Sequence, residues 1–241
     1  MNNKYQALIL AAGEGKRLMP FTLEKPKCLA RVNGCTILEN SLNILANNGC
    51  THTTIVIGHH ADVIKELIAY NFSGMPISYV ENHDFRSTNS MYSLTLGLDA
   101  IDEPAWILEG DVFFENSIIN LPTRNHISWF VDSSIRELDG AYIEYDSKYV
   151  AKSLEIIRDV NFIRPGQSKS VGILKLSRNG VNKIKEWLKN GVASGHKNEY
   201  YDLTLGTHLN ESLISVVDVA GLRWFEIDTL DDLEKANRIF C

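Results

Sequence analysis

The sequence has no long apolar run. None of its hydrophobic stretches approaches the roughly 18 residues that a helix needs to cross a membrane, although hydrophobic residues make up 44% of the 241-residue chain. Residues 1–6 are polar and lack the apolar core of a signal peptide. We therefore expect a cytoplasmic protein that does not enter a membrane and that has enough apolar residues for a substantial core.

Paired cysteines and an excess of positive charge are also missing. The four cysteines show no C-x-x-C spacing, so we expect free thiols rather than a zinc site or a disulfide. The net charge of −6 disfavours a nucleic-acid-binding protein, which needs a broad basic face. Residues 1–31 differ from the rest, because they hold six lysines and arginines against two glutamates. A solvated basic face is one reading of this segment, but its tight turns favour an anion-binding site.

Strand-like and helix-like patterns alternate over the first half of the chain. Strands and helices are predicted in turn at residues 5–11, 36–46, 53–57, 61–70, 77–80, 91–100 and 105–108. This alternation predicts βαβ units and an α/β fold with a Rossmann-like, mixed, mostly parallel sheet flanked by helices. Strand-like segments dominate from about residue 126 to 176, which predicts an inserted antiparallel region, and helices resume after it.

A glycine-containing loop follows the first predicted strand. Gly13 and Gly15 have no Cβ, so the backbone can turn tightly and bring its N–H groups against a phosphate or a base. The dinucleotide motif G-x-G-x-x-G would need a glycine at Leu18, and a P-loop would need serine or threonine after Gly15-Lys16, where Arg17 stands. Neither motif fits. The cations behind the turn instead suit a chain of phosphates.

This segment resembles the signature of the nucleotidyltransferases that activate small phosphorylated metabolites, written L-A-A-G-x-G-x-R, P-x-T, P-K-x-L and V-x-G. The matching residues run from Leu10 to Gly34. The resemblance implies that the loop backbone holds base and ribose, that Arg17 binds the triphosphate and that Lys27 contacts the α-phosphate. The nucleotide-binding segment that it implies consists of Leu10, Ala11, Ala12, Gly13, Glu14, Gly15 and Lys16.

Two later carboxylates match the same family. The sequence Glu-Gly-Asp that ends at Asp111 lies where the family has a metal-binding aspartate, and Asp228 ends a segment resembling the strand that supplies the second carboxylate. Mg²⁺ prefers oxygen ligands, so these aspartates and phosphate oxygens suit it. The alternatives are a turn aspartate at Asp111 and, at Asp228, an aid to a helix capped by Thr229. We expect Glu109 and Glu226 to point to the other face, as second-rank candidates.

The stretch from Glu81 to Leu94 departs from the loop with which sugar-phosphate members of the family read uracil or thymine. It is similar to the N-x-x-Y-S-L segment of the CTP-dependent branch, which includes phosphocholine and aminoethylphosphonate cytidylyltransferases. The resemblance implies CTP as donor, and the amide and hydroxyl groups of the stretch suit a cytosine edge. A polar surface loop is the alternative. The candidate residues are Asn82, Thr88, Asn89 and Ser90.

The resemblance also implies a small phosphorylated or phosphonate acceptor. Aromatic faces bind choline-type cations, which makes Trp129, Tyr200 and Tyr201 candidates, with core packing as the alternative for each. The two tyrosines belong to a Y-Y-D segment that resembles an acceptor-lining segment of this branch. Lys152 is a candidate for the acceptor phosphate by loose family position, and Glu226 is a further acceptor candidate.

We therefore predict one nucleotidyltransferase domain over residues 1–241, with a nucleotide-binding half over about 1–125 and an acceptor-binding half over about 126–241. The predicted reaction is transfer of CMP from CTP, with Mg²⁺ as cofactor and release of pyrophosphate. A sugar-1-phosphate uridylyl- or thymidylyltransferase and a catalytically silent nucleotide-sensing subunit are the alternatives. The expected partners are CTP and the acceptor, without nucleic acid or membrane, and a homodimer is left open.

Overall fold

The computed structural model describes residues 5–211 and 213–241, so that Lys4 of the basic segment lies outside the described residues. The first half of the chain forms a parallel sheet. Strand β1 (Tyr5–Ala11) lies between β4 (Cys50–Ile57) and β6 (Ala105–Glu109), and β5 (Ile77–Glu81) pairs with the free edge of β4. The carboxyl ends of these strands therefore meet at one edge, where open α/β sheets bind their ligands.

The second half extends the same sheet with antiparallel strands. Strand β11 (Ser168–Leu176) pairs with β6, and also with β8 (Ile127–Asp132) and β9 (Gly140–Tyr145). Two strands complete it, of which β10 (Ala151–Ile157) pairs with β9 and β12 (Ile214–Asp218) pairs with β8. Within the described residues nine strands thus form one mixed sheet, which confirms the predicted fold class.

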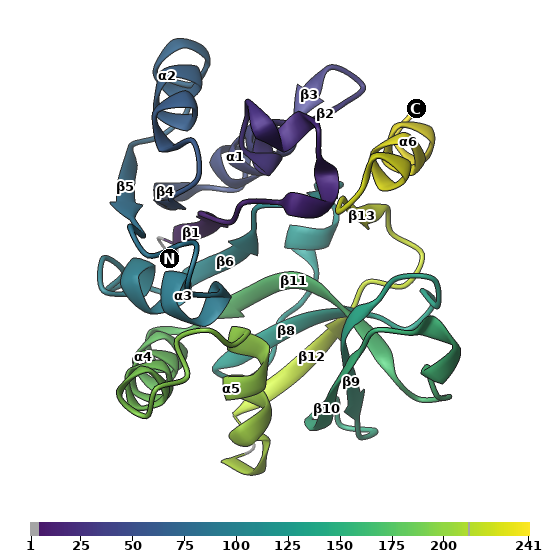
Figure 1. The fold of residues 1–241 in the computed structure, drawn as a ribbon. Helices are drawn as coiled ribbons and strands as arrows, with labels where there is room; N and C mark the ends of the chain where they lie inside the picture. Colours follow the sequence, from purple (N-terminus) through teal and green to yellow (C-terminus); the bar gives the residue numbers. More distant parts are fainter. Residues whose placement is uncertain (1–4, 212) are drawn as a thin grey trace.

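Helices cover both faces of this sheet (Figure 1). Because side chains alternate along a strand, Ala7 and Ile9 of β1 pack with helices α1 (Ile37–Asn47) and α2 (Ala61–Asn71). Leu8 of β1 faces the opposite way, toward the second group of helices. That group comprises α3 (Ser90–Leu98), α4 (Arg178–Ala193) and α5 (Tyr201–Thr207).

Short elements connect the sheet to its helices. The strands outside the main sheet are β2 (Arg31–Val32), β3 (Cys35–Thr36), β7 (Val112–Phe114) and β13 (Trp224–Glu226). The 3-10 helices are η1 (Lys16–Leu18), η2 (Phe21–Leu23), η3 (Lys27–Leu29), η4 (Ile118–Asn120), η5 (Val160–Phe162) and η6 (Leu209–Glu211). Helix α6 (Leu230–Ile239) is the last helix of the described chain. No helix in the described ranges has both the length and the apolar character of a membrane span.

Candidate active site

A tight glycine turn follows β1 and packs on a later part of the basic segment. Gly15 has a left-handed φ of 60°, which costs glycine little because it has no Cβ. A Cβ at Gly15 would lie 3.0 Å from the Lys27 Cβ and 3.1 Å from the Thr22 Cγ2. The Thr22 hydroxyl donates a hydrogen bond of 3.0 Å to the Gly15 carbonyl. The glycine therefore allows the turn to lie directly against the segment that carries Lys27.

The turn after β6 lies equally close to β1. A Cβ at Gly110 would stand 2.4 Å from the carbonyl oxygen of Leu10, which leaves no room for a side chain. Asp111 follows this glycine and precedes β7, which pairs antiparallel with β13. The Ile227 N–H donates to the Asp111 carbonyl at 2.9 Å, so the strand pair brings Asp228 beside Asp111. Two carboxylates that are 117 positions apart in the sequence thus meet next to the glycine turn.

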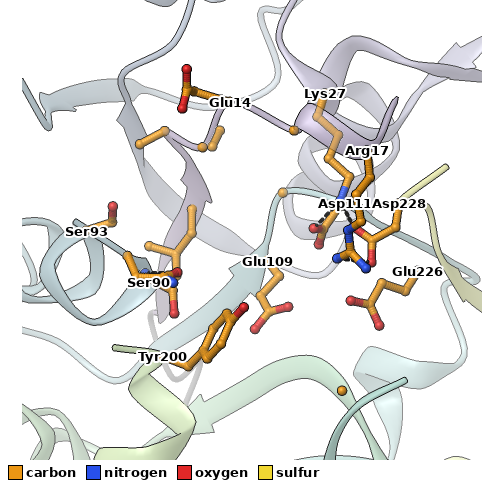
Figure 2. Close-up of a pocket in the computed structure, with 18 of the residues that line it drawn as sticks. Glu14, Arg17, Lys27, Ser90, Ser93, Glu109, Asp111, Tyr200, Glu226 and Asp228 are labelled. Atoms are coloured by element: carbon orange, nitrogen blue, oxygen red, sulfur yellow. Dashed lines mark hydrogen bonds and ion pairs between the residues drawn. The ribbon is translucent and has the colours of Figure 1, made fainter. Parts of the chain in front are cut away.

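Cations and carboxylates meet at this point (Figure 2). The Lys27 Nζ lies 2.7 Å from the Asp111 Oδ2 and also donates to Asp228, while the Arg17 Nη2 lies 2.6 Å from the Asp228 Oδ2. Carboxylate oxygens of Asp111, Glu226 and Asp228 all lie within 4.8 Å of one another. Both predicted phosphate-binding cations and both predicted metal-binding aspartates therefore belong to one cluster, here called the charge cluster, with Glu226 as a third carboxylate.

Burial and charge act in opposite directions within the charge cluster. Burial alone would lower the pKa of Lys27, but the attraction of Asp111 and Asp228 outweighs it and raises that pKa above its ordinary value. Burial likewise opposes ionisation of Asp228, yet Lys27 and Arg17 hold its pKa below its usual range. At neutral pH Lys27 and Asp228 are therefore both charged.

The carboxylates of the charge cluster fit a divalent cation. The Asp111 Oδ1 is buried, and it has no hydrogen-bond partner among residues 5–211 and 213–241. A buried carboxylate oxygen without a partner is costly, and a hard cation with oxygen ligands would satisfy it. Thr229 does cap α6 through its hydrogen bond from the Asp232 N–H, but Asp228 still reaches the cluster, so the two roles coexist.

The expected orientation of Glu109 and Glu226 is wrong. Alternation with a period of two puts residues i and i+2 of an extended segment on the same face, not on opposite faces. Both glutamates line the same pocket as Asp111 and Asp228. Glu109 accepts a hydrogen bond of 2.8 Å from the Tyr201 hydroxyl, and Glu226 accepts one of 2.7 Å from Lys169.

These side chains line a cavity of about 510 Å³ at the carboxyl edge of the parallel strands. Ser90 and Ser93 lie on one side of it and the charge cluster on the other, with Glu109 between them (Figure 2). The predicted nucleotide-binding residues that line this cavity are Leu10, Ala11, Ala12, Gly13, Glu14, Gly15, Lys16, Thr88, Asn89 and Ser90.

Asn82 is not among the residues that line the cavity. It is 1% exposed, and its amide donates to the Thr88 Oγ1 at 3.1 Å and to the Ser93 Oγ at 3.0 Å. Its Oδ1 accepts from the Asp84 N–H. With both of its N–H groups and its oxygen in use, Asn82 holds the loop in shape, and the Thr88 hydroxyl continues this network by donating to the Asp84 carbonyl at 2.9 Å.

Only some of the predicted acceptor-binding residues line the cavity. Tyr200 and Glu226 line the cavity. Tyr201 is buried beneath it and reaches Glu109 only through its hydroxyl. Trp129 is a core residue whose indole N–H donates to Ser170, and Lys152 is an exposed residue of β10 that pairs with Asp146 at 3.0 Å. Neither Trp129 nor Lys152 is among the residues that line the cavity.

Four charged residues that sequence reasoning did not select also line the cavity: Arg86, Arg158, Lys169 and Asp202. Burial raises the pKa of Asp202 to about 6, although Lys169 opposes the shift. Burial also raises the pKa of Glu109 well above its ordinary value, with a further contribution from Asp202. The position of Asp202 directly after Tyr200-Tyr201 was the one signal in the sequence that pointed to it.

Comparisons with known proteins agree with this geometry. Residues 7–121 match the model of the MobA-like NTP transferase domain. The chain is 29% identical, over 96% of its length, to a CMP-5'-(3-aminopropyl)phosphonate synthase of Streptomyces rubellomurinus, of which it spans 38%. It is 25% identical to a 2-aminoethylphosphonate cytidylyltransferase of Lancefieldella rimae and 27% identical to a choline-phosphate cytidylyltransferase of Streptococcus pneumoniae. It spans 91% and 97% of these two proteins and is itself covered over 95% and 97%.

The fold has a close counterpart among solved structures. The structure of CTP:phosphocholine cytidylyltransferase from Streptococcus pneumoniae matches with a TM-score of 0.79 at 21% identity, over 99% of this chain and 100% of that one. The family resemblance drawn from the glycine loop and the two aspartates is thereby confirmed. Residues 7–121 thus form a MobA-like NTP transferase domain, and the chain is similar over nearly its whole length to cytidylyltransferases and to a CMP-phosphonate synthase.

Proposed function

We propose that the protein is a Mg²⁺-dependent cytidylyltransferase that transfers CMP from CTP to a small phosphorylated or phosphonate acceptor and releases pyrophosphate. The observation that carries this proposal is the charge cluster, in which Lys27 and Arg17 meet Asp111 and Asp228 at one end of the cavity. A protein that only senses a nucleotide does not need clustered carboxylates beside its phosphate-binding cations. The three relatives, whose names all specify CMP or cytidylyl chemistry, support CTP as donor.

The nucleotide would lie between the glycine turn and the loop before α3. The backbone of residues 11–15 borders the cavity where β1 ends, and Thr88, Asn89 and Ser90 border it from the other side. The Thr88 hydroxyl already donates to the Asp84 carbonyl, so the Asn89 amide and the Ser90 hydroxyl are the groups offered to a cytosine edge. The triphosphate would then extend toward Arg17 and Lys27.

Asp111 and Asp228 are the residues proposed to hold Mg²⁺, with Glu226 as a third candidate ligand. Mg²⁺ bound there would supply positive charge against the α-phosphate and the pyrophosphate. Lys27 and Arg17 would exchange their carboxylate partners for phosphate oxygens of CTP. They would thereby offset the repulsion between the triphosphate and an anionic acceptor.

The acceptor needs no general base. A phosphate monoester with a second pKa of about 6 is largely dianionic at neutral pH. One of its oxygens attacks the α-phosphorus of CTP, the bond from that phosphorus to the bridging oxygen of the β-phosphate breaks, and pyrophosphate leaves with the electron pair. Catalysis then consists of holding two anions in line and stabilising the charge that develops.

Arg158 is better placed than Lys152 for the acceptor phosphate. It lines the cavity beside Tyr200, whose hydroxyl accepts from the Arg158 Nη2 at 2.9 Å. Its Nη1 lies 3.0 Å from Asp139. About half of the Arg158 side chain remains exposed, so the guanidinium can form further hydrogen bonds to an incoming anion.

The test is pyrophosphate release with CTP, UTP, ATP and GTP, each offered with 2-aminoethylphosphonate, phosphocholine and glucose-1-phosphate. We expect release with CTP and one of the first two acceptors, and loss of the activity in EDTA. Preferred use of UTP with glucose-1-phosphate would contradict the proposal and support the uridylyltransferase alternative. Tight CTP binding without release from any pair would support the silent subunit.

A further inference from the structure

A second pair of carboxylates lines the cavity on the side of α5. Glu109 ends β6, and Asp202 lies on α5, with only 6% of its surface exposed. Glu109 is hydrogen-bonded to the neutral Tyr201 hydroxyl. Within the ranges 5–211 and 213–241, neither Glu109 nor Asp202 forms an ion pair with a lysine, arginine or histidine. The pair, here called the amine site, therefore has no direct cationic partner in the described part of the chain.

The buried lysine nearby is already engaged. Lys169 is 3% exposed, and its Nζ donates to the Glu226 Oε2 at 2.7 Å and to the Ser170 carbonyl at 3.0 Å. Lys169 is the one buried lysine near Glu109, Asp202 and Glu226 in the described part of the chain. Its ammonium group pairs with Glu226, so that Glu109 and Asp202 remain without a cation. Buried charges are rarely tolerated without compensation.

One oxygen of the amine site lacks any partner. The Asp202 Oδ1 is buried and accepts no hydrogen bond from the part of the chain that the structure describes. Asp202 nevertheless lines the cavity. A buried carboxylate oxygen that borders a ligand cavity and has no donor of its own indicates that the donor belongs to the ligand.

The kind of cation follows from what surrounds the amine site. A primary ammonium group has three N–H donors and needs acceptors, whereas a trimethylammonium group has none and is bound by aromatic faces. On this side of the cavity Tyr200 is the aromatic residue of the lining, and the Arg158 guanidinium already lies over its ring, 5.2 Å from the centroid. Trp129 and Tyr201 are buried outside the lining. The amine site therefore offers the oxygen acceptors that a primary ammonium group needs, and it lacks the aromatic cage that a trimethylammonium group would require.

We propose that Glu109 and Asp202 bind a primary ammonium group of the acceptor, so that the protein selects aminoalkyl phosphonates or phosphates over their trimethylammonium counterparts. The inference rests on the proposed function and specifies its acceptor. The anionic end of such a molecule would lie toward the charge cluster, where Glu109 is two residues from Asp111. The ammonium would supply the positive charge that the amine site lacks.

The test compares matched acceptors with CTP and Mg²⁺. One pair is 2-aminoethylphosphonate and its N-trimethyl analogue, and the other is phosphoethanolamine and phosphocholine, so that phosphonate and phosphate chemistry are separated from the amine. The free energy of hydrogen bonds to a charged group corresponds to a factor of about tenfold to a hundredfold in kcat/KM between an acceptor that forms them and one that does not. We expect kcat/KM to favour the primary amine by this factor in both pairs.

Single substitutions test whether Glu109 and Asp202 cause the preference for the primary amine. Asp202→Asn and Glu109→Gln keep size and polarity but remove charge, and we expect each to reduce the preference to within about threefold. Glu186→Gln removes an exposed carboxylate of α4 and should keep the full preference. If one of the two carboxamide variants fails to fold, the other still tests the amine site. The comparison of acceptors with the wild-type protein does not depend on any variant.

The outcomes separate this inference from the proposed function. Equal or better use of the trimethyl acceptors by the wild-type protein would overturn the inference and leave the cytidylyltransferase intact. An unchanged preference in both carboxamide variants would overturn the amine site. Failure of CTP to release pyrophosphate with any of the four acceptors would overturn the proposed function, and the inference with it.

Discussion

At the scale of single residues, Lys27 determines the charge balance of the site. Its ammonium group contacts Asp111 and Asp228 together, and these two carboxylates lie within reach of Glu226. One cation therefore separates carboxylates that would otherwise repel each other at short range. The same ammonium group is expected to contact the α-phosphate when CTP is bound, so its two partners compete for it.

The replacement Lys27→Met keeps the length of the side chain and removes the charge. We expect kcat to fall by about 100- to 1000-fold, the effect of losing one donor to a developing oxyanion. In EDTA the variant should melt below the wild-type protein, because Asp111 then loses its ion pair and Asp228 keeps only Arg17. Mg²⁺ should raise the melting temperature of the variant more than that of the wild type. Lys25→Met, at an exposed position of the same segment, is the control. A variant with near-normal kcat would contradict the role of Lys27.

Sequence reasoning located residues that belong to a local motif and failed where burial decides. Arg17 and Lys27 could be found because the signature around them fixes their spacing. Nothing local distinguishes Trp129, a core residue, from a cavity aromatic, since both readings need the same apolar side chain. Lys169 was missed because a charged residue in a short apolar segment acquires meaning only from the opposite charges that the fold places around it.

At the scale of elements, the pairing of β7 with β13 builds the charge cluster. Glu226 lies opposite Val112 in this ladder, which places Asp111 and Asp228 at the same end of it. The approach of the β6–β7 turn to β1 depends on Gly110, whose absent side chain leaves room for the Leu10 carbonyl. The metal-binding geometry is therefore a property of backbone packing as well as of the aspartates.

The replacement Gly110→Ala tests this dependence. Its Cβ would clash with backbone rather than with a mobile side chain, so the turn must shift and carry Asp111 with it. Overpacking of this kind costs about 1–3 kcal/mol, or about 2–4 °C of melting temperature per kcal/mol, and kcat/KM should fall more than stability alone explains. Gly74→Ala, whose Cβ would meet only side-chain atoms, serves as the comparison. Unchanged stability and activity in Gly110→Ala would show that the close approach is unimportant.

The strongly patterned elements were predictable and the short ones were not. The prediction of a strand at residues 5–11 coincides with β1, and that of a helix at 61–70 ends one residue before α2 does. Strand β7 has three residues, too few to show a period, and the half-buried β10 mixes apolar with polar residues. The partner of a strand over 100 positions away is set by the whole fold, which no local pattern records.

At the scale of the whole molecule, the cavity joins the two halves of the chain. Strand β11 of the second half pairs directly with β6 of the first, so one sheet runs through both. The glycine loop and Asp111 come from the first half, and Arg158, Asp202 and Asp228 come from the second. On this ground we propose that residues 1–241 form one domain, in which nucleotide and acceptor meet at the junction.

The most direct test of this account is a crystal structure of the protein with CTP and Mg²⁺ in the absence of acceptor. The account predicts the triphosphate between the glycine turn and the charge cluster, with Lys27 and Arg17 on phosphate oxygens and the metal on Asp111 and Asp228. A nucleotide seated elsewhere, with Lys27 still bridging the two aspartates, would contradict it.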